Sequence, residues 1–178
     1  MILGCPFGNS IDIWSLGCLL FEFLTGLPLF QIPPISGRPE VMIDYHLIQM
    51  TDIIHPLPET LLEKWTRAGR YFGPDGERLD CKPMDFDGSD SADSDFGGDD
   101  DDGYDDDSVD MEEDDLGENE PPQRHDSLEK LFRANKTADV DEEEASEITG
   151  LLRWILQYDA TKRPSATELL EHPWIKLD

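Results

Sequence analysis

Serine side chains surrounded by carboxylates, within one acidic stretch, are the residues of this chain whose arrangement most plainly suggests chemistry, namely phosphorylation. Residues 85–120 hold 19 of the 41 acidic residues and no lysine or arginine. Kinases that recognise acidic surroundings favour such serines, and each phosphate would add a charge of about −1.5 to −2. The candidate phosphorylation sites are Ser89, Ser91, Ser94 and Ser108.

The same stretch has two further interpretations. The simplest is a solvated loop whose like charges repel, so that it stays disordered. The other is an electrostatic attractor for basic, Arg/Ser-rich protein segments, with a pull that fades as salt rises. Calcium is a weaker expectation. The run from Asp99 to Asp102 lacks the positioned glutamate of an EF-hand loop, so at most weak, unselective binding is expected.

Outside this stretch, the residue types that serve catalysis or metal binding are scattered. The four histidines show no metal or triad spacing; they are His46, His55, His125 and His172. No serine or cysteine lies in a nucleophile elbow, so hydrolase chemistry has no support. The three cysteines argue against a disulfide framework and for a reducing compartment. We therefore expect an intracellular protein, in the cytoplasm, the nucleus or both. We expect no metal site and no cofactor in this chain.

The charge divides the chain into two kinds of sequence. Its 178 residues carry a net charge of −27, which excludes a basic surface for nucleic acid. Residues 85–120 account for −19 of this charge, and the remainder, with four tryptophans and eight phenylalanines, is sufficient to bury a core. No secretory signal is expected at the start of the chain. We therefore expect folded segments at 1–82 and 125–178, separated by an acidic disordered insertion at 83–124.

The element that would position functional groups in the first segment is a helix over residues 10–25. Ser10 is expected to cap its start and Gly26 to end it. The helix is apolar on nearly all sides, which is typical of a large core or of lipid. It is shorter than the ~20 residues that span a membrane and carries Asp12 and Glu22, which favours the centre of a soluble domain.

Two shorter elements should follow in the first segment. Val41, Tyr45 and Ile48 fall at i, i+4 and i+7, the spacing of an amphipathic helix. Pro58 suits the first position of another helix. Residues 71–82 are expected to form an irregular or hairpin-like connection.

The second segment should contain three helices. A start resembling a capping box occurs at residues 126–129, and Asp141 precedes a periodic apolar run that should end near Tyr158. Ser165 is expected to cap the last helix. The elements together predict a mainly α fold.

Two separated segments resemble the same family. Residues 2–6, ILGCP, running into DIWSLGC at 12–18, look like the stretch of a eukaryotic protein kinase that follows the activation segment and enters the F helix. The sequences ILQYDATKRPSA at 155–166 and HPWI at 172–175 resemble the end of that fold. The resemblance implies a partial C-terminal lobe of a protein kinase.

The region between these segments resembles the SR-protein kinases of the CMGC group, at residues 45–54, 62–65, 69–72 and 128–131. That likeness implies a parent activity of ATP- and Mg-dependent phosphorylation of serine in Arg/Ser-rich proteins. It also implies docking of basic substrates by acids in the insert. Asp52 falls where one such acid is expected, whereas Tyr45 takes the place of another with Asp44 beside it. A solvated helix face is the alternative for Asp44 and Asp52.

The family likeness gives structural rather than catalytic roles to three residues. Asp12 and Trp14 belong to the F-helix motif, in which the aspartate anchors the catalytic loop from beneath. Arg163 matches the arginine that pairs with the glutamate of the A-P-E motif, and it should lack that partner here. A first-turn acid favoured by the helix dipole and a surface arginine are the simpler alternatives for Asp12 and Arg163.

Four of the motifs that hold nucleotide and metal in kinases do not occur in these 178 residues: G-x-G-x-x-G, V-A-I-K, H-R-D and A-P-E. The tripeptide D-F-G does occur, at residues 95–97, but it lies inside the acidic stretch and after the DIWSLGC segment, whereas in kinases D-F-G precedes A-P-E and the F helix. We expect a lobe fragment without catalytic or cofactor-binding residues; an intact relative would bind ATP and Mg²⁺. We expect the partners of this chain to be the missing kinase N-lobe and activation segment. We expect it to bind neither nucleic acid nor a membrane. Alternatives are a non-catalytic acidic module that binds basic segments, or a truncated gene product.

Without the rest of a kinase domain to cover it, the first helix should expose apolar surface around Trp14 and Phe21.

Overall fold

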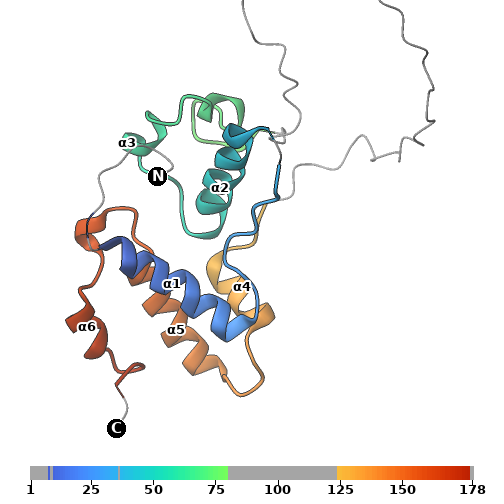
Figure 1. Cartoon of the computed structure of the whole chain (residues 1–178). Coiled ribbons are helices and arrows are strands. Elements are labelled where there is room, and N and C mark those ends of the chain that lie inside the picture. The colour runs from blue at the N-terminus through green and yellow to red at the C-terminus, as the bar shows by residue number, and fades with distance from the viewer. Residues whose placement is uncertain (1–7, 9, 36, 80–123, 177–178) are drawn as a thin grey trace, which may run out of the picture.

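The computed structural model describes residues 8, 10–35, 37–79 and 124–176, and there the chain is built from helices (Figure 1). The expected mainly α fold is confirmed. The α-helices are α1 (Ser10–Thr25), α2 (Pro39–Ile53), α3 (Glu59–Leu62), α4 (Leu128–Asn135), α5 (Glu142–Ile155) and α6 (Ala166–Leu170); the 3₁₀ helices are η1 (Ala68–Arg70) and η2 (Ala160–Lys162). Apart from Arg124, the predicted insertion lies outside the described residues.

Helix α1 packs closely against α5 through a glycine. A Cβ atom on Gly17 would lie 2.5 Å from Cγ2 of Ile155 and 3.0 Å from Cδ2 of Leu156, so only hydrogen fits there. On the same side of α1, the Phe21 ring meets Phe132 of α4 edge-on, with centroids 6.2 Å apart. Helix α1 therefore shares one core with helices from the second segment.

The end of α1 is as the sequence predicts, and its start differs by one residue. Gly26 follows the last helical residue with φ at +73°, a left-handed conformation that glycine adopts without strain. Ser10, expected as the N-cap, is itself the first helical residue.

The exposed apolar surface of α1 is on the side opposite to the one expected. Phe21 is 2% exposed and Trp14 is partly buried, because α4, α5 and Tyr158 cover them. The exposed side instead carries Leu16, Leu19 and Phe23, of which Phe23 is 78% exposed, and Ile11 in the first turn is exposed as well. The expectation that surface around Trp14 and Phe21 is uncovered is therefore wrong.

Side-chain caps set the starts of the helices in the second segment. Ser127 accepts a hydrogen bond from the backbone of Lys130 at the start of α4, and Asp141 does the same at α5. Ser165 and Glu168 form a complete capping box at α6. All three predicted starts are confirmed, although α5 ends at Ile155, three residues before Tyr158.

A second, smaller core lies beneath α2. Its buried members are Leu47, Ile48, Leu57, Trp65 and Tyr71. The predicted helix around Val41 is confirmed as α2, and Pro58 lies one position before α3, as its N-cap. In the described residues β pairing is limited to one antiparallel bridge between Phe72 and Arg78, which fits the hairpin-like connection predicted there.

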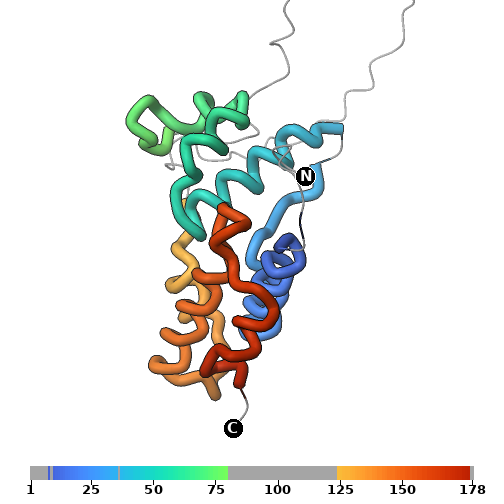
Figure 2. Tube along the Cα trace, turned by 90° about the vertical axis from the view of Figure 1, so that its left-hand side faces the viewer, coloured from blue at the N-terminus to red at the C-terminus, as the bar shows by residue number. Residues whose placement is uncertain are grey.

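Tyr158 joins the two cores. Its hydroxyl shares one proton between the carbonyl oxygens of Met50 in α2 and His55 just after it, 2.8 and 2.9 Å away, while its ring stacks on Trp14 of α1. Gln49 adds a two-way link, accepting from the backbone N–H of Gln31 and donating to its carbonyl. In Figures 1 and 2 the α2–α3 group lies at one end of the molecule and the α1, α4, α5 and α6 group at the other. The C-terminal end of α2 is therefore held against the larger core.

None of the helices in the part of the chain that the structure describes has the length and hydropathy needed to cross a bilayer.

Candidate functional site

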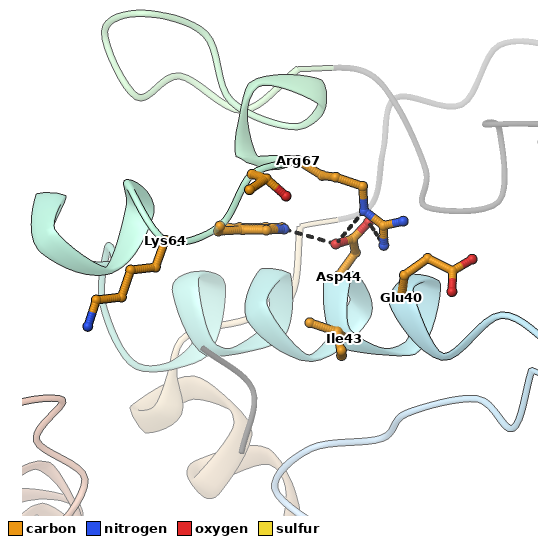
Figure 3. A pocket seen from close by; sticks show the side chains of 7 residues that line it. Glu40, Ile43, Asp44, Lys64 and Arg67 are labelled. Carbon is orange, nitrogen blue, oxygen red and sulfur yellow. Dashed lines mark hydrogen bonds and ion pairs between the residues drawn. The ribbon is translucent and has the colours of Figure 1, made fainter. Parts of the chain in front are cut away.

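Helix α2 holds the two acids that the sequence singles out for binding, and the structure places them very differently. Asp44 lies in the middle of the helix and is 1% exposed. Its Oδ1 accepts from Nε1 of Trp65 at 2.9 Å, and its Oδ2 accepts from the hydroxyl of Tyr71 at 2.5 Å. Arg67 completes the group, with Nη2 2.7 Å from Oδ2 and Nε 3.3 Å from Oδ1 (Figure 3).

These contacts give Asp44 an internal role. A buried carboxylate is tolerated only when it is paired and hydrogen-bonded, and here three side chains supply both conditions. Burial, together with the hydrogen bond to Asp44, raises the pKa of the Tyr71 phenol, so the hydroxyl keeps the proton that it donates. The expectation of Asp44 as an exposed docking acid, or as part of a solvated face, is wrong, because its own chain already occupies both oxygens.

A cavity of about 310 Å³ opens beside this cluster. Its lining is Glu40, Ile43, Asp44, Lys64, Trp65, Thr66 and Arg67. Asp44 and Arg67 neutralise each other, and in Figure 3 Glu40 and Lys64 lie on opposite sides of the pair. The lining thus combines two charges of each sign with the apolar side chains of Ile43 and Trp65, and it favours neither an anion nor a cation.

Asp52 lies in the last turn of α2, and its partner is a histidine from the second segment. Its Oδ2 is 3.3 Å from the backbone nitrogen of His125 and 3.1 Å from Nδ1 of the same residue. The Asp52 side chain is 9% exposed and that of His125 38% exposed. The last turn of α2 contains no basic residue, and a helix C-terminus carries roughly half a negative charge. The carboxylate and the helix end therefore add to a negative potential that favours a cation.

The structural residues of the family motif gather where α1 meets η2. Arg163 donates from Nη1 to the carbonyl of Ser10 at 2.9 Å and from Nε to that of Gln157 at 2.7 Å, and its guanidinium lies 5.0 Å from the Trp14 ring centroid. Within the described residues, Arg163 is therefore held by backbone carbonyls and an aromatic face. Asp12 is exposed in the first turn of α1.

The remaining candidates add little chemistry. The four candidate phosphorylation sites, from Ser89 to Ser108, lie outside the described residues. No cluster of three or more metal-ligating side chains occurs within the described ranges. Burial raises the pKa of the Cys18 thiol to about 11, which leaves it a poor nucleophile at neutral pH.

Sequence reasoning missed the partners of both acids. Trp65, Arg67 and Tyr71 are 21 to 27 residues from Asp44, and His125 is 73 residues from Asp52. No local spacing signals such pairs. The only hint was the aromatic and basic composition of residues 64–72, which suits the neutralisation of a buried acid.

Comparison with known proteins identifies the class to which this fold and its motifs belong. The family model of the protein kinase domain matches residues 1–175, and the chain belongs to the protein kinase family. The serine/threonine-protein kinases SKY1 of Saccharomyces cerevisiae and SRPK of Physarum polycephalum are each 27% identical to it, over 99% and 98% of this chain. AFC3 of Arabidopsis thaliana is 29% identical over 99% of the chain.

These relatives confirm the resemblance to SR-protein kinases and the CMGC group. They are much longer than this chain, which covers 18% of SKY1, 31% of SRPK and 34% of AFC3. The described helices are accordingly consistent with part of a kinase C-lobe.

Proposed function

We propose that these 178 residues are a C-lobe fragment of an SR-protein-kinase-like serine/threonine kinase and that their own task is to dock substrate rather than transfer phosphate. The parent activity is ATP-dependent phosphorylation of serine in Arg/Ser-rich proteins. The glycine-rich loop, the V-A-I-K lysine and the H-R-D loop of kinases do not occur in this sequence, and its D-F-G tripeptide at residues 95–97 lies out of order, after the F-helix segment. ATP and Mg²⁺ would be held by an N-lobe and activation segment outside these residues, and catalysis requires them.

The observation that carries the docking proposal is the position of Asp52. A carboxylate at the C-terminal end of a helix, with no basic residue in that turn, lies in a negative potential. A guanidinium fits a carboxylate through two parallel hydrogen bonds, which makes arginine the best match among basic side chains. The partner class is therefore a basic, Arg/Ser-rich segment.

The test is the affinity of the full chain for a synthetic Arg/Ser-rich peptide, measured by calorimetry at low and high salt. Asp52→Asn should weaken binding about tenfold at low salt, because a charge-assisted pair is lost. Asp75→Asn is the matched control: it removes the same charge from an exposed position after η1 and should change affinity less than twofold. Equal effects of the two variants would contradict docking at Asp52.

The second candidate function is a non-catalytic acidic module that binds basic segments through residues 85–120. Its support is the concentration of 19 acids there without a single lysine or arginine. If this second function is correct, replacing Asp99 to Asp102 by asparagine should weaken peptide binding far more than Asp52→Asn does. If docking at α2 dominates, the order reverses.

A further inference from the structure

The contact between Asp52 and His125 joins the two folded segments next to the proposed docking acid. Both hydrogen bonds from His125 converge on Oδ2, one from the backbone and one from the ring. No described residue donates to Oδ1. The carboxylate is thus half occupied by a residue of its own chain, with only 9% of the Asp52 side chain exposed.

We propose that His125 is an internal competitor for the docking acid: a substrate arginine gains the full carboxylate of Asp52 only by displacing the His125 ring. This inference rests on the proposed docking function. A bidentate guanidinium needs both carboxylate oxygens, and Nδ1 of His125 already lies 3.1 Å from one of them. The imidazole therefore sets how tightly a basic segment binds and disfavours ligands with a single weak positive charge.

The His125 side chain is free to move without loss of the fold. Helix α4, which starts three residues later, is held by its Ser127 cap and by Leu128 and Phe132, which are both fully buried. A bidentate pair between Arg153 and Glu129 fastens α4 to α5. The His125 side chain itself is 38% exposed, and an ion pair at such exposure contributes little to stability. Its displacement is accordingly a local event.

Two other acids of these elements already have basic partners of their own. In the same segment Asp126 is engaged with Lys130, whose Nζ lies 2.5 Å from its Oδ1. On α2, Asp44 is neutralised by Arg67 and lies two helical turns away. Among the residues that the structure describes, the His125 ring is thus the basic side chain in contact with the proposed docking acid.

The experiment compares His125→Ala and His125→Arg in the full chain, with the same Arg/Ser-rich peptide and calorimetry at low salt. Removing the ring should tighten binding about two- to fivefold, because the competitor is absent. A permanently charged arginine should weaken binding to the level of Asp52→Asn. Lys130→Ala is the control for a charge change in the same segment and should leave affinity within twofold. Near-ultraviolet circular dichroism checks that each variant is folded.

The outcomes separate this inference from the docking function. If Asp52→Asn weakens peptide binding but His125→Ala binds the peptide like the unaltered chain, the competition by His125 is refuted and docking at Asp52 stands. If Asp52→Asn has no effect, docking itself fails. Support requires that the gain from His125→Ala disappears in the double variant with Asp52→Asn, because only coupled residues give such non-additivity.

Discussion

The hydroxyl of Tyr71 donates to Oδ2 of Asp44 across 2.5 Å, and this bond ties the segment after η1 to the middle of α2. Trp65 and Arg67 bind the same carboxylate, so three side chains of one short segment converge on a single buried acid. The α2–α3 end of the molecule is small, and this cluster is its polar centre. The position of α2, and with it of Asp52, depends on it.

Asp44→Asn should therefore destabilise the α2–α3 region. The amide keeps the shape but loses the charge that Arg67 and Tyr71 bind, and we expect a loss of about 2–4 kcal/mol in the free energy of unfolding. Tyr71→Phe removes one hydrogen bond and should cost about 1–2 kcal/mol. Urea unfolding followed by tryptophan fluorescence measures both values, since Trp65 lies in the cluster. A smaller loss for Asp44→Asn than for Tyr71→Phe would contradict the central place of the carboxylate.

Two glycines offer a matched test of the contact between α1 and α5. Gly17→Ala introduces a Cβ only 2.5 Å from Ile155, so α1 or the Ile155 side chain must shift, at a cost of about 1–3 kcal/mol. Gly150→Ala on α5 meets nothing within 4 Å and should stabilise the chain by about 0.5–1 kcal/mol through helix propensity. Thermal unfolding should thus give shifts of opposite sign. Shifts of the same sign would show that α1 and α5 do not pack as described.

The exposed apolar side of α1 predicts a separation of solubility from stability. Phe23→Ser removes a ring that is 78% exposed and should reduce self-association with less than about 0.5 kcal/mol of change in stability. Phe21→Ala, two residues earlier, removes a buried ring and should cost about 3–5 kcal/mol. Light scattering and urea unfolding on the two variants distinguish these effects. Equal destabilisation by both would place Phe23 in the core.

The pair of Glu129 and Arg153 predicts a dependence of stability on acid pH. The hydrogen bonds from Arg153 lower the pKa of Glu129 from 4.5 to about 2. The stabilisation from this pair is therefore complete above about pH 4.5 and lost as the pH falls toward about 2. Solvent screening at this partly exposed site limits it to about 1 kcal/mol. The difference in unfolding free energy between the unaltered chain and Glu129→Gln should shrink over that range, and a difference independent of pH would contradict the assignment.

The sequence predicts the helices well because their signals are local. Three helix starts are marked by the capping residues Ser127, Asp141 and Ser165, and the end of α1 is marked by Gly26. It predicts the site poorly because burial is a tertiary property. Asp44 is an acid in an amphipathic pattern, and nothing within the helix shows that Trp65 and Tyr71 fold over it.

The face of α1 illustrates the same limit. A helix that is apolar on nearly every side does not reveal which side is covered, and the choice is made by contacts with α4 and α5, more than 100 residues later. The family motifs were easier to read, since they depend on the order of residues rather than on what packs against them. They indicate Asp52, but not its partner His125.

Amide NMR spectra of the isotope-labelled full chain, titrated with an Arg/Ser-rich peptide, test docking at α2 most directly. We expect the largest shifts at Asp52 to Ile54 and at His125 and Asp126, and their loss in Asp52→Asn. Shifts confined to residues 85–120, with the end of α2 unchanged, would contradict docking at Asp52 and favour the acidic stretch as the binding element.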